Sequence, residues 1–531
     1  MSLRHRIPVR VRHYWKLLAV CAAFLVTCAV VFSTVRVAPL VTSASDDTAD
    51  TVTRNVAGTT DLFDATVAHS IKLTFHDDDY QRLLDSFWTE GEKEFLEADI
   101  TIDGTTMASV GIRLKGNSTL GGLTRNGVSR PGGFGPGGGQ GQRQNGGIPG
   151  GNPGGFPGGG APAGGGFNRA SLKAEEPETL PWLIRFDEFV DGRVYQGHRE
   201  IAVRVAGMGG GTTVLNEAVS LDVLAAAGQT AQRYAYTGFT VNDRPTTARL
   251  IVEHPDEGFA GTLGGSGVLY KSLASGQFAD QGDDPTAYTD DFKQITMKGS
   301  QDLQPVIDLI KWVTSSSDAE FAKHLADHVD VPSFARYLAV QNLLLNFDDM
   351  SGPGRNYYLW YDLKSRKFTV VGWDYNLTFS GNATQGPHDA MTMGGGRGGF
   401  QPPEGMQPPP GAGQQPGGGQ QPGGGQQPGG AQQPGGGQGR PGGFGGGGHK
   451  LKDRFLASAA FTTTYEDAYR ELYRKMFAGA TALTSVDRIA SVLATVDGSD
   501  RQKATAEADQ LRTVIRQRTQ HLATDPVITK A

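Results

Sequence analysis

The sequence predicts an α+β fold in which a β-rich half precedes a helical half. Up to about residue 271, short alternating or apolar runs typical of β-strands dominate, and helices are expected only at residues 77–87 and 214–227. From residue 302 onward the pattern is helical, apart from one β-hairpin over residues 357–373.

The N-terminal segment predicts a membrane anchor. Residues 1–16 are basic, and residues 17–35 carry no charged side chain, which is about the length (~20 residues) that a helix needs to cross a bilayer. Basic residues favour a cytoplasmic N-terminus, so we expect a single-pass membrane protein with a tether at residues 36–60 and an extracytoplasmic domain at residues 61–531. The alternative is a signal peptide cleaved near Ala44, which would make the protein secreted.

The strands of the first half are separated by recognisable turns. Asp103-Gly104 divides the second strand from the third, and Asn242-Asp243 forms the turn of a hairpin. The expected strands cover residues 70–75, 98–102, 110–115, 182–186, 200–205, 236–241, 248–253 and 268–271.

The helices of the second half follow from apolar periodicity and from their first residues. Pro332 suits the first turn of the helix over residues 332–346. The other expected helices cover residues 303–314, 318–328, 461–477 and 503–522.

Two low-complexity inserts interrupt the domain, at residues 121–166 and 381–448. The first is Gly/Pro-rich, and the second repeats QQPGGG with a six-residue period. Neither carries enough apolar surface to offset the entropy of ordering it, so we expect both to be disordered spacers. The repeat lacks a strict Gly-X-Y period, which excludes collagen.

Composition excludes several function classes. The net charge is −6 and no basic stripe occurs in the folded part, so we expect no nucleic-acid partner. Both cysteines, Cys21 and Cys28, lie in the N-terminal apolar run, which leaves the domain without a disulfide or a cysteine metal site. The chain has no H-E-x-x-H and no G-x-S-x-G motif, which argues against zinc proteases and serine hydrolases.

The residues that carry chemistry gather between residues 341 and 379. Asp348 and Asp349 follow an apolar helix, Asn356 opens the hairpin, and Asp374 ends it, with Asn376 two residues later. Protein kinases build their centre from an acid, an amide and a second acid spaced by a hairpin. We therefore take Asp348 and Asp349 as candidate proton acceptors and Asp374, Asn356 and Asn376 as candidate Mg²⁺ ligands.

These segments resemble the CotH (spore coat protein H) kinase family. The resemblance covers residues from about 70 to 518 without the two inserts, and it is carried by N-x-D, NYYLW and WDYNLTF together with GIRLKGNST, FDEFVDGRVYQG, LIVEHPDEGF, VLYKS and HKLKDRFLAS. It implies an atypical protein-kinase-like domain of two lobes, a β-rich N-lobe and a helical C-lobe, with ATP and Mg²⁺ (or Mn²⁺) as cofactors. It also implies a kinase that phosphorylates Ser/Thr of cell-surface or spore-coat proteins.

The motif and the spacing favour different catalytic residues. The N-x-D element of the family assigns the proton acceptor to Asp348, whereas Asp349 lies nearer to the kinase spacing from Asn356. Asn376 departs from the family, which often has aspartate there. The family also often has lysine just before the position of Trp182, where this chain has Thr179, Leu180 and Pro181.

The residues that would bind the nucleotide phosphates are several cations on β-type runs, with Lys271 first. Glu217 lies in the first turn of the helix over residues 214–227, where a kinase places the glutamate that pairs with the phosphate-binding lysine; a solvated glutamate is the alternative. Glu253 marks the segment that would join the lobes. The candidate set is Lys271, Lys115, Arg113, Arg185, Glu217 and Glu253.

A non-catalytic adhesion or structural protein with a kinase-like fold is the alternative function. The Asp/Asn/Asp set favours catalysis, whereas Asn376 and the absent lysine favour a binding role. Mg²⁺- or Mn²⁺-dependent nucleotide binding discriminates between the two.

Overall fold

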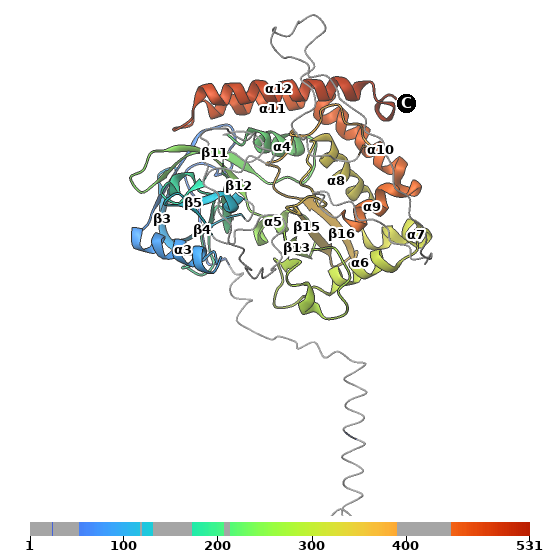
Figure 1. The fold of residues 1–531 in the computed structure, drawn as a ribbon, viewed down its shortest axis with the longest axis horizontal. Coiled ribbons are helices and arrows are strands. Elements are labelled where there is room, and N and C mark those ends of the chain that lie inside the picture. The colour runs from blue at the N-terminus through green and yellow to red at the C-terminus, as the bar shows by residue number, and fades with distance from the viewer. Residues whose placement is uncertain are drawn as a thin grey trace, which may run out of the picture.

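The fold is taken from a computed structural model, which describes Phe24 and residues 52–116, 119–130, 172–205, 213–389 and 448–530 (Figure 1). Its described part is a mixed α/β structure, with a closed barrel, a four-stranded sheet and helices around that sheet. The strands concentrate before residue 295 and most helices follow, as the sequence predicts.

The barrel closes in the order β10-β12-β11-β2-β3-β4-β8. Every neighbouring pair is antiparallel except β2 and β11, which run parallel. Closure leaves no unpaired edge, and alternate side chains such as Ile71, Leu73 and Trp182 fill the interior. The strands are β2 (His69–Thr74), β3 (Leu96–Ile102), β4 (Thr105–Leu114), β8 (Trp182–Arg185), β10 (Glu200–Val203), β11 (Tyr234–Val241) and β12 (Thr247–Glu253).

The second sheet is antiparallel, in the order β14-β13-β15-β16. Its strands are β13 (Gly267–Ser272), β14 (Phe292–Gln294), β15 (Tyr357–Asp362) and β16 (Lys367–Gly372). The predicted hairpin is therefore β15–β16, in which β15 is a central strand of the sheet and β16 is an edge strand.

Helices cover the sheet and continue to the end of the described chain. Ser317 and Glu320 form a capping box at the start of α7, and the Asp330 carboxylate caps α8. The helices are α3 (Asp77–Thr89), α4 (Leu215–Ala226), α5 (Glu257–Thr262), α6 (Gln304–Ser315), α7 (Asp318–His328), α8 (Val331–Leu343), α9 (Lys450–Ala457), α10 (Ala459–Tyr473), α11 (Thr481–Leu493), α12 (Arg501–Ala523) and α13 (Pro526–Thr529), with a π-helical turn at Arg474–Ala478.

Helix α4 is buried around most of its circumference, between the barrel and the C-terminal helices (Figure 1). Asp222 of α4 accepts a hydrogen bond from Ser485 Oγ of α11 (2.6 Å) and pairs with Arg488. Glu507 of α12 accepts a hydrogen bond from the Thr213 N–H (3.0 Å) at the start of α4. These contacts and a shared apolar core hold α4 in one position.

Three predicted segment boundaries are corrected by the described residues. The tether contains β1 (Arg54–Val56), which pairs with β9 (Arg193–Tyr195). The first insert contains β5 (Leu123–Arg125) and β6 (Val128–Ser129), which form a small sheet with β7 (Leu172–Lys173) and bury Leu123. Both segments fold because their few apolar residues find partners that are distant in sequence.

The second insert also begins later than predicted. Gly386 accepts a hydrogen bond from the Asn342 side chain (3.2 Å), and Gln385 accepts one from Arg518, so residues 381–389 belong to the fold. Residues 131–166 and 390–447 of the two inserts lie outside the described residues.

The predicted localisation, a single-pass membrane protein with an extracytoplasmic domain, is contradicted. No helix of the described chain is both long and apolar enough to cross a membrane. The segment expected to be cytoplasmic, residues 1–16, and the expected span, residues 17–35, lie outside the described residues except for Phe24.

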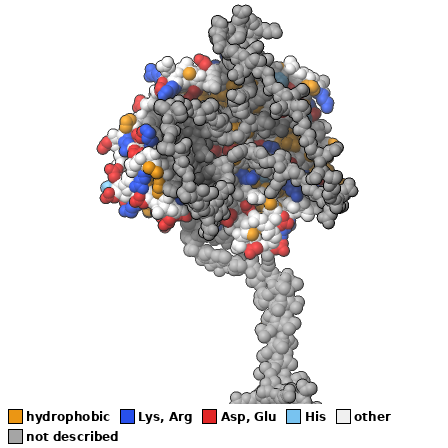
Figure 2. Space-filling view, viewed as in Figure 1, with side chains coloured by type: hydrophobic (Ala, Val, Ile, Leu, Met, Phe, Trp, Pro, Cys, Tyr) orange, Lys and Arg blue, Asp and Glu red, His pale blue; other side chains and the backbone are white. Residues whose placement is uncertain are grey.

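The visible face carries acidic and basic side chains interspersed over its described surface (Figure 2).

Candidate functional site

A cavity of about 240 Å³ lies where β4, β10, α4 and the four-stranded sheet meet. Each element contributes one or two polar side chains to the lining of the cavity. The apolar part of the lining consists of Val203, Trp373 and Leu377 among others. Most of the predicted site residues line it, namely Arg113, Lys115, Glu217, Lys271, Asp348, Asn356, Asp374 and Asn376.

The loop after α8 positions Asp348. Leu345 has a φ of 53°, a left-handed conformation that ends the helix. Asn346 then donates its Nδ2 to Gln341 Oε1 (2.8 Å), and its Oδ1 accepts the Asp348 N–H (3.2 Å). The Asn of the N-x-D element therefore fixes the backbone from which the Asp348 carboxylate projects.

The Gly-Pro-Gly turn wraps closely around the Asp348 carboxylate. Its Oδ1 accepts the Gly354 N–H (2.5 Å), and its Oδ2 accepts Asn356 Nδ2 (3.0 Å). A Cβ at Gly352 or Gly354 would collide with Asp348, which explains both glycines. Burial raises the pKa of Asp348 to about 7; the Gly354 N–H opposes this shift, and the Asp374 carboxylate adds to it. A carboxylate with a pKa near neutrality is suited to accept a proton.

Asp349 occupies a different environment from its neighbour and does not line the cavity. It is buried, forms an ion pair with Lys452 of α9, and accepts the Ser351 N–H (2.8 Å). Its carboxylate is therefore used to join the turn to α9.

Asp374 follows β16 in a strained conformation. Its φ is 58°, a region that non-glycine residues rarely occupy and that concentrates at functional sites. Its buried Oδ1 accepts no hydrogen bond from the described residues, although Arg204 lies 3.3 Å away. Asn216 of α4 donates to the carbonyls of Asn376 (2.6 Å) and Thr378 (3.2 Å), which holds the turn that presents Asp374.

Arg204 and Glu217 form a buried ion pair beside Asp374. Arg204 follows β10 and lies over the Trp373 ring (4.7 Å to the centroid). Burial alone would lower the pKa of Arg204, but the charges of Asp374 and Glu217 outweigh it and raise that pKa. Burial also raises the pKa of Glu217, against the opposing charge of Arg204.

Two of the lysines that line the cavity were predicted as phosphate-binding residues. Lys115 lies over Trp373 (5.3 Å), and burial, with Arg204 and Arg113 nearby, lowers its pKa to about 7. Lys271 lies over Tyr358 (4.7 Å), and burial lowers its pKa to about 8 despite Asp374 and Asp348. An anionic ligand in this cavity would favour the charged ammonium groups and raise both pKa values.

The cavity offers oxygen ligands of two kinds. Asp374 has a buried oxygen without a hydrogen bond, and Asn356 uses its Nδ2 on Asp348, which leaves its Oδ1 as an acceptor. Carboxylate and amide oxygens suit Mg²⁺, which keeps several waters and phosphate oxygens in its shell. Among the described residues, no group of three or more His, Cys, Asp or Glu side chains is placed to hold a metal ion. The residues present therefore fit a cation that a phosphorylated ligand helps to bind.

Comparison with known families decides the identity. The family model described as CotH kinase protein matches residues 171–522, a span that contains Arg204, Glu217, Lys271 and the whole segment from Asp348 to Asn376. The chain belongs to the CotH kinase family. Among curated proteins, none matches the chain. Arg113 and Lys115, which line the same cavity, precede the matched span.

Two residues predicted to bind phosphate or to join the lobes in this CotH kinase family member do not line the cavity. The Nε atom of Arg185 lies 2.7 Å from a carboxylate oxygen of Asp187 and 3.9 Å from one of Glu200, so acidic side chains neutralise its charge. Glu253 accepts the Arg233 N–H (3.0 Å) and lies 3.5 Å from His198. Both residues therefore make structural contacts on barrel strands.

The sequence patterns did not identify Arg204, the cation that pairs with Glu217 in this member of the CotH kinase family. Arg204 follows β10, the last barrel strand before α4. In protein kinases, the cation that pairs with the glutamate of the corresponding helix is a lysine on a strand of the N-lobe. Arg204 is identified when the residue after β10 is allowed to be arginine as well as lysine.

Proposed function

We propose that this CotH kinase family member is an active protein kinase that transfers the γ-phosphate of ATP to Ser or Thr hydroxyls of protein substrates. The barrel half and the helical half then correspond to the N-lobe and C-lobe of an atypical kinase. The observation that carries the proposal is the convergence of Asp348, Asn356 and Asp374 on one cavity that also holds the Arg204–Glu217 ion pair. Surface or spore-coat proteins are the proposed substrates, and nucleic acids are not.

Asp348 is the proposed proton acceptor. It accepts hydrogen bonds from Gly354 and Asn356 on separate oxygens, which fixes its orientation. Its raised pKa, to about 7, lets it take the hydroxyl proton in the transition state. Asp349 is excluded from this role in the proposal because Lys452 holds its carboxylate outside the cavity lining.

Asp374 and Asn356 are the proposed holders of Mg²⁺ or Mn²⁺, with Asn376 beside them. When bound, the metal supplies positive charge that neutralises the transferring phosphates. Arg204, Lys115 and Lys271 are the side chains positioned to orient the same phosphates. Glu217 keeps Arg204 directed toward Asp374.

The test is phosphate transfer from labelled ATP by the full chain, using casein as a general acceptor. We expect transfer by the wild type, loss with Asp374→Ala, and retention with Asp308→Ala, an exposed aspartate on α6. Equal transfer by both variants would refute the proposed site.

A non-catalytic adhesion or structural role is the second candidate. The described chain lacks a group of three acidic or imidazole metal ligands, and Asn376 takes the place of an acid. That candidate predicts no Mg²⁺-dependent change in nucleotide affinity, which calorimetry of the full chain measures directly.

A further inference from the structure

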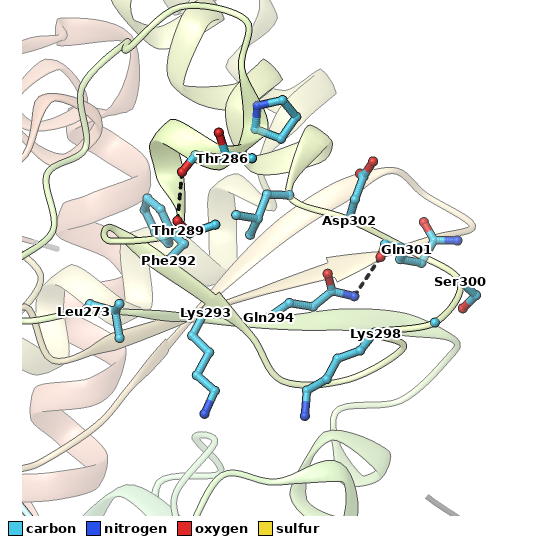
Figure 3. Close-up of a pocket in the computed structure, with 13 residues that line it drawn as sticks. Leu273, Thr286, Thr289, Phe292, Lys293, Gln294, Lys298, Ser300, Gln301 and Asp302 are labelled. Atoms are coloured by element: carbon cyan, nitrogen blue, oxygen red, sulfur yellow. Dashed lines mark hydrogen bonds between the residues drawn. The ribbon is translucent and has the colours of Figure 1, made fainter. Parts of the chain in front are cut away.

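A second cavity, of about 700 Å³, adjoins the candidate active site. Leu273 lines both cavities, because β13 runs from Lys271 in the first to the edge of the second. The second cavity is formed by β14, the turn that precedes it and the loop that leads to α6 (Figure 3). Its volume is within the range of ligand-binding pockets.

Two lysines define the charge of this second cavity. Lys293 and Lys298 line it, both are exposed, and their side chains extend in the same direction (Figure 3). Neither forms an ion pair with a described residue. Partial desolvation, followed by the charge of Lys298, lowers the pKa of Lys293, which shows that the two ammonium groups influence each other.

Strand register connects these lysines to the candidate active site. In the antiparallel pair of β13 and β14, Lys293 lies directly opposite Lys271. Opposite residues place their side chains on the same face of a sheet, and like charges at such a pair are destabilising. Lys271 faces the carboxylates of Asp374 and Asp348, whereas the charge of Glu200 acts on Lys293 without an ion pair between the two residues. An unpaired cation beside another cation is typical of a surface that binds an anion.

The third charged residue that lines this cavity does not cancel the lysines. Asp302 points away from them (Figure 3), and its carboxylate accepts the Gln304 N–H (2.9 Å) at the start of α6. The rest of the lining is mixed: Phe292 and Leu303 are buried apolar residues, and Thr286 and Gln301 are polar. Such a lining suits an extended polypeptide more than a compact anion.

From this geometry we infer that Lys293 and Lys298 form a docking subsite for acidic side chains that flank the phosphorylated residue of the acceptor polypeptide. The inference rests on the protein-kinase function proposed above and adds the charge class of its substrate. The nucleotide phosphates have their own cations in the first cavity, namely Arg204, Lys115 and Lys271. Lys293 and Lys298 are therefore available to bind the acceptor polypeptide.

The test measures peptide binding without ATP. Three dye-labelled octapeptides carry one serine flanked by glutamate, glutamine or lysine, and fluorescence polarisation gives their affinities for the full chain. The variant Lys293→Gln/Lys298→Gln is compared with the wild type and with Lys323→Gln/Lys364→Gln, a matched pair of exposed lysines that lines neither cavity. Melting temperatures confirm that both double variants fold.

We expect the wild type and the matched control to bind the glutamate peptide about tenfold more tightly than the glutamine peptide. The Lys293/Lys298 variant should lose this preference while its affinity for Mg²⁺-ATP stays unchanged. The same preference in that variant, no preference in the wild type, or an equal loss of nucleotide affinity would each overturn the inference.

Transfer of labelled phosphate to the same peptides separates the two proposals. A glutamate preference that depends on both lysines, without transfer to any peptide, supports the docking subsite and counts against the kinase function. Transfer that ignores the flanking charge, with equal binding of all three peptides, supports the kinase function and overturns the subsite.

Discussion

The guanidinium of Arg204 lies 3.3 Å from the Asp374 carboxylate. The same guanidinium forms an ion pair with Glu217 of α4, so one cation connects a barrel strand, a helix and the turn after β16. Buried ion pairs of this kind contribute little net stability when complete, but removal of one partner leaves unpaired charges inside the protein.

Replacement of Arg204 by glutamine should therefore destabilise the protein. We expect a loss of about 3–5 kcal/mol in the free energy of unfolding, because Glu217 and Asp374 lose their cation. Arg204→Lys should lose less. Urea denaturation measures both, with Arg336→Gln as a control, since the half-exposed Arg336–Glu471 pair is worth about 1 kcal/mol at most. Equal losses for the two glutamine variants would contradict the prediction.

Asp348 and Asp349 should respond differently to replacement by asparagine. Asp348→Asn should lower kcat by about 10²–10⁴-fold and leave the nucleotide Kd nearly unchanged, because it removes the proposed proton acceptor. Asp349→Asn should keep turnover but lose about 3 kcal/mol of stability, because Lys452 loses its partner. Kinetics, calorimetry and urea denaturation distinguish the two.

Reversed effects on kcat would assign the proton acceptor to Asp349. Full turnover by both variants would show that the kinase mechanism does not operate on this loop.

Acid should destabilise the protein through His449. This side chain is buried beside the Tyr357 hydroxyl (3.0 Å), and burial lowers its pKa from 6.5 to about 3. As the pH falls below 6.5, His449 becomes protonated in the unfolded chain, whereas in the folded protein it stays neutral down to about pH 3. Stability present above pH 6.5 is thus lost at up to about 1.4 kcal/mol per pH unit.

The matched measurement is urea denaturation of the wild type and His449→Gln at pH 7, 6 and 5. The variant should show a shallower decline, since other groups, such as the buried His254, titrate equally in both proteins. Parallel declines would mean that His449 is protonated in the folded state or titrates normally there.

The first insert should tolerate deletion only from residue 131 onward. Replacing residues 131–166 by a short Gly/Ser linker should leave the free energy of unfolding nearly unchanged, with slight stabilisation from the shorter loop, about 0.6 kcal/mol per halving. Replacing residues 121–166 also removes β5 and β6. It should cost about 2–5 kcal/mol, because Leu123 leaves the barrel core. Similar unfolding curves for both deletions would contradict this boundary.

Local patterns predict most elements of the fold but not how they associate. The alternation in residues 70–75 and the helix expected over residues 77–87 correspond to β2 and α3, and the hairpin after Asn356 is present. Barrel closure depends on the parallel pairing of β2 with β11, which joins strands far apart in the chain. No local pattern encodes that pairing. For the same reason, the partner of Leu123 across the insert was not predictable.

The candidate site shows the same division between local and distant information. Asp348, Asn356 and Asp374 lie within one continuous segment, residues 341–379, and all three line the same cavity. Asp348 and Asp349 are adjacent in sequence, and the ion pair of Asp349 with Lys452, a residue from beyond the second insert, helps to separate their environments. Arg185 and Glu253 resemble site residues by strand position, but the Asp187 carboxylate binds Arg185 and the backbone N–H of Arg233 binds Glu253 outside the cavity.

The packing of α4 against α11 and α12 has a consequence for the order of events during biosynthesis. The barrel is complete once residue 253 has emerged from the ribosome, but the helix that carries Glu217 still lacks the partners of Asp222 and Thr213. Those partners, Ser485 and Glu507, are translated long afterwards, and domains fold as their residues become available. A nascent chain therefore carries all the strands of the barrel before α4 has these partners, and the candidate site is fully assembled only after residue 507 has been translated.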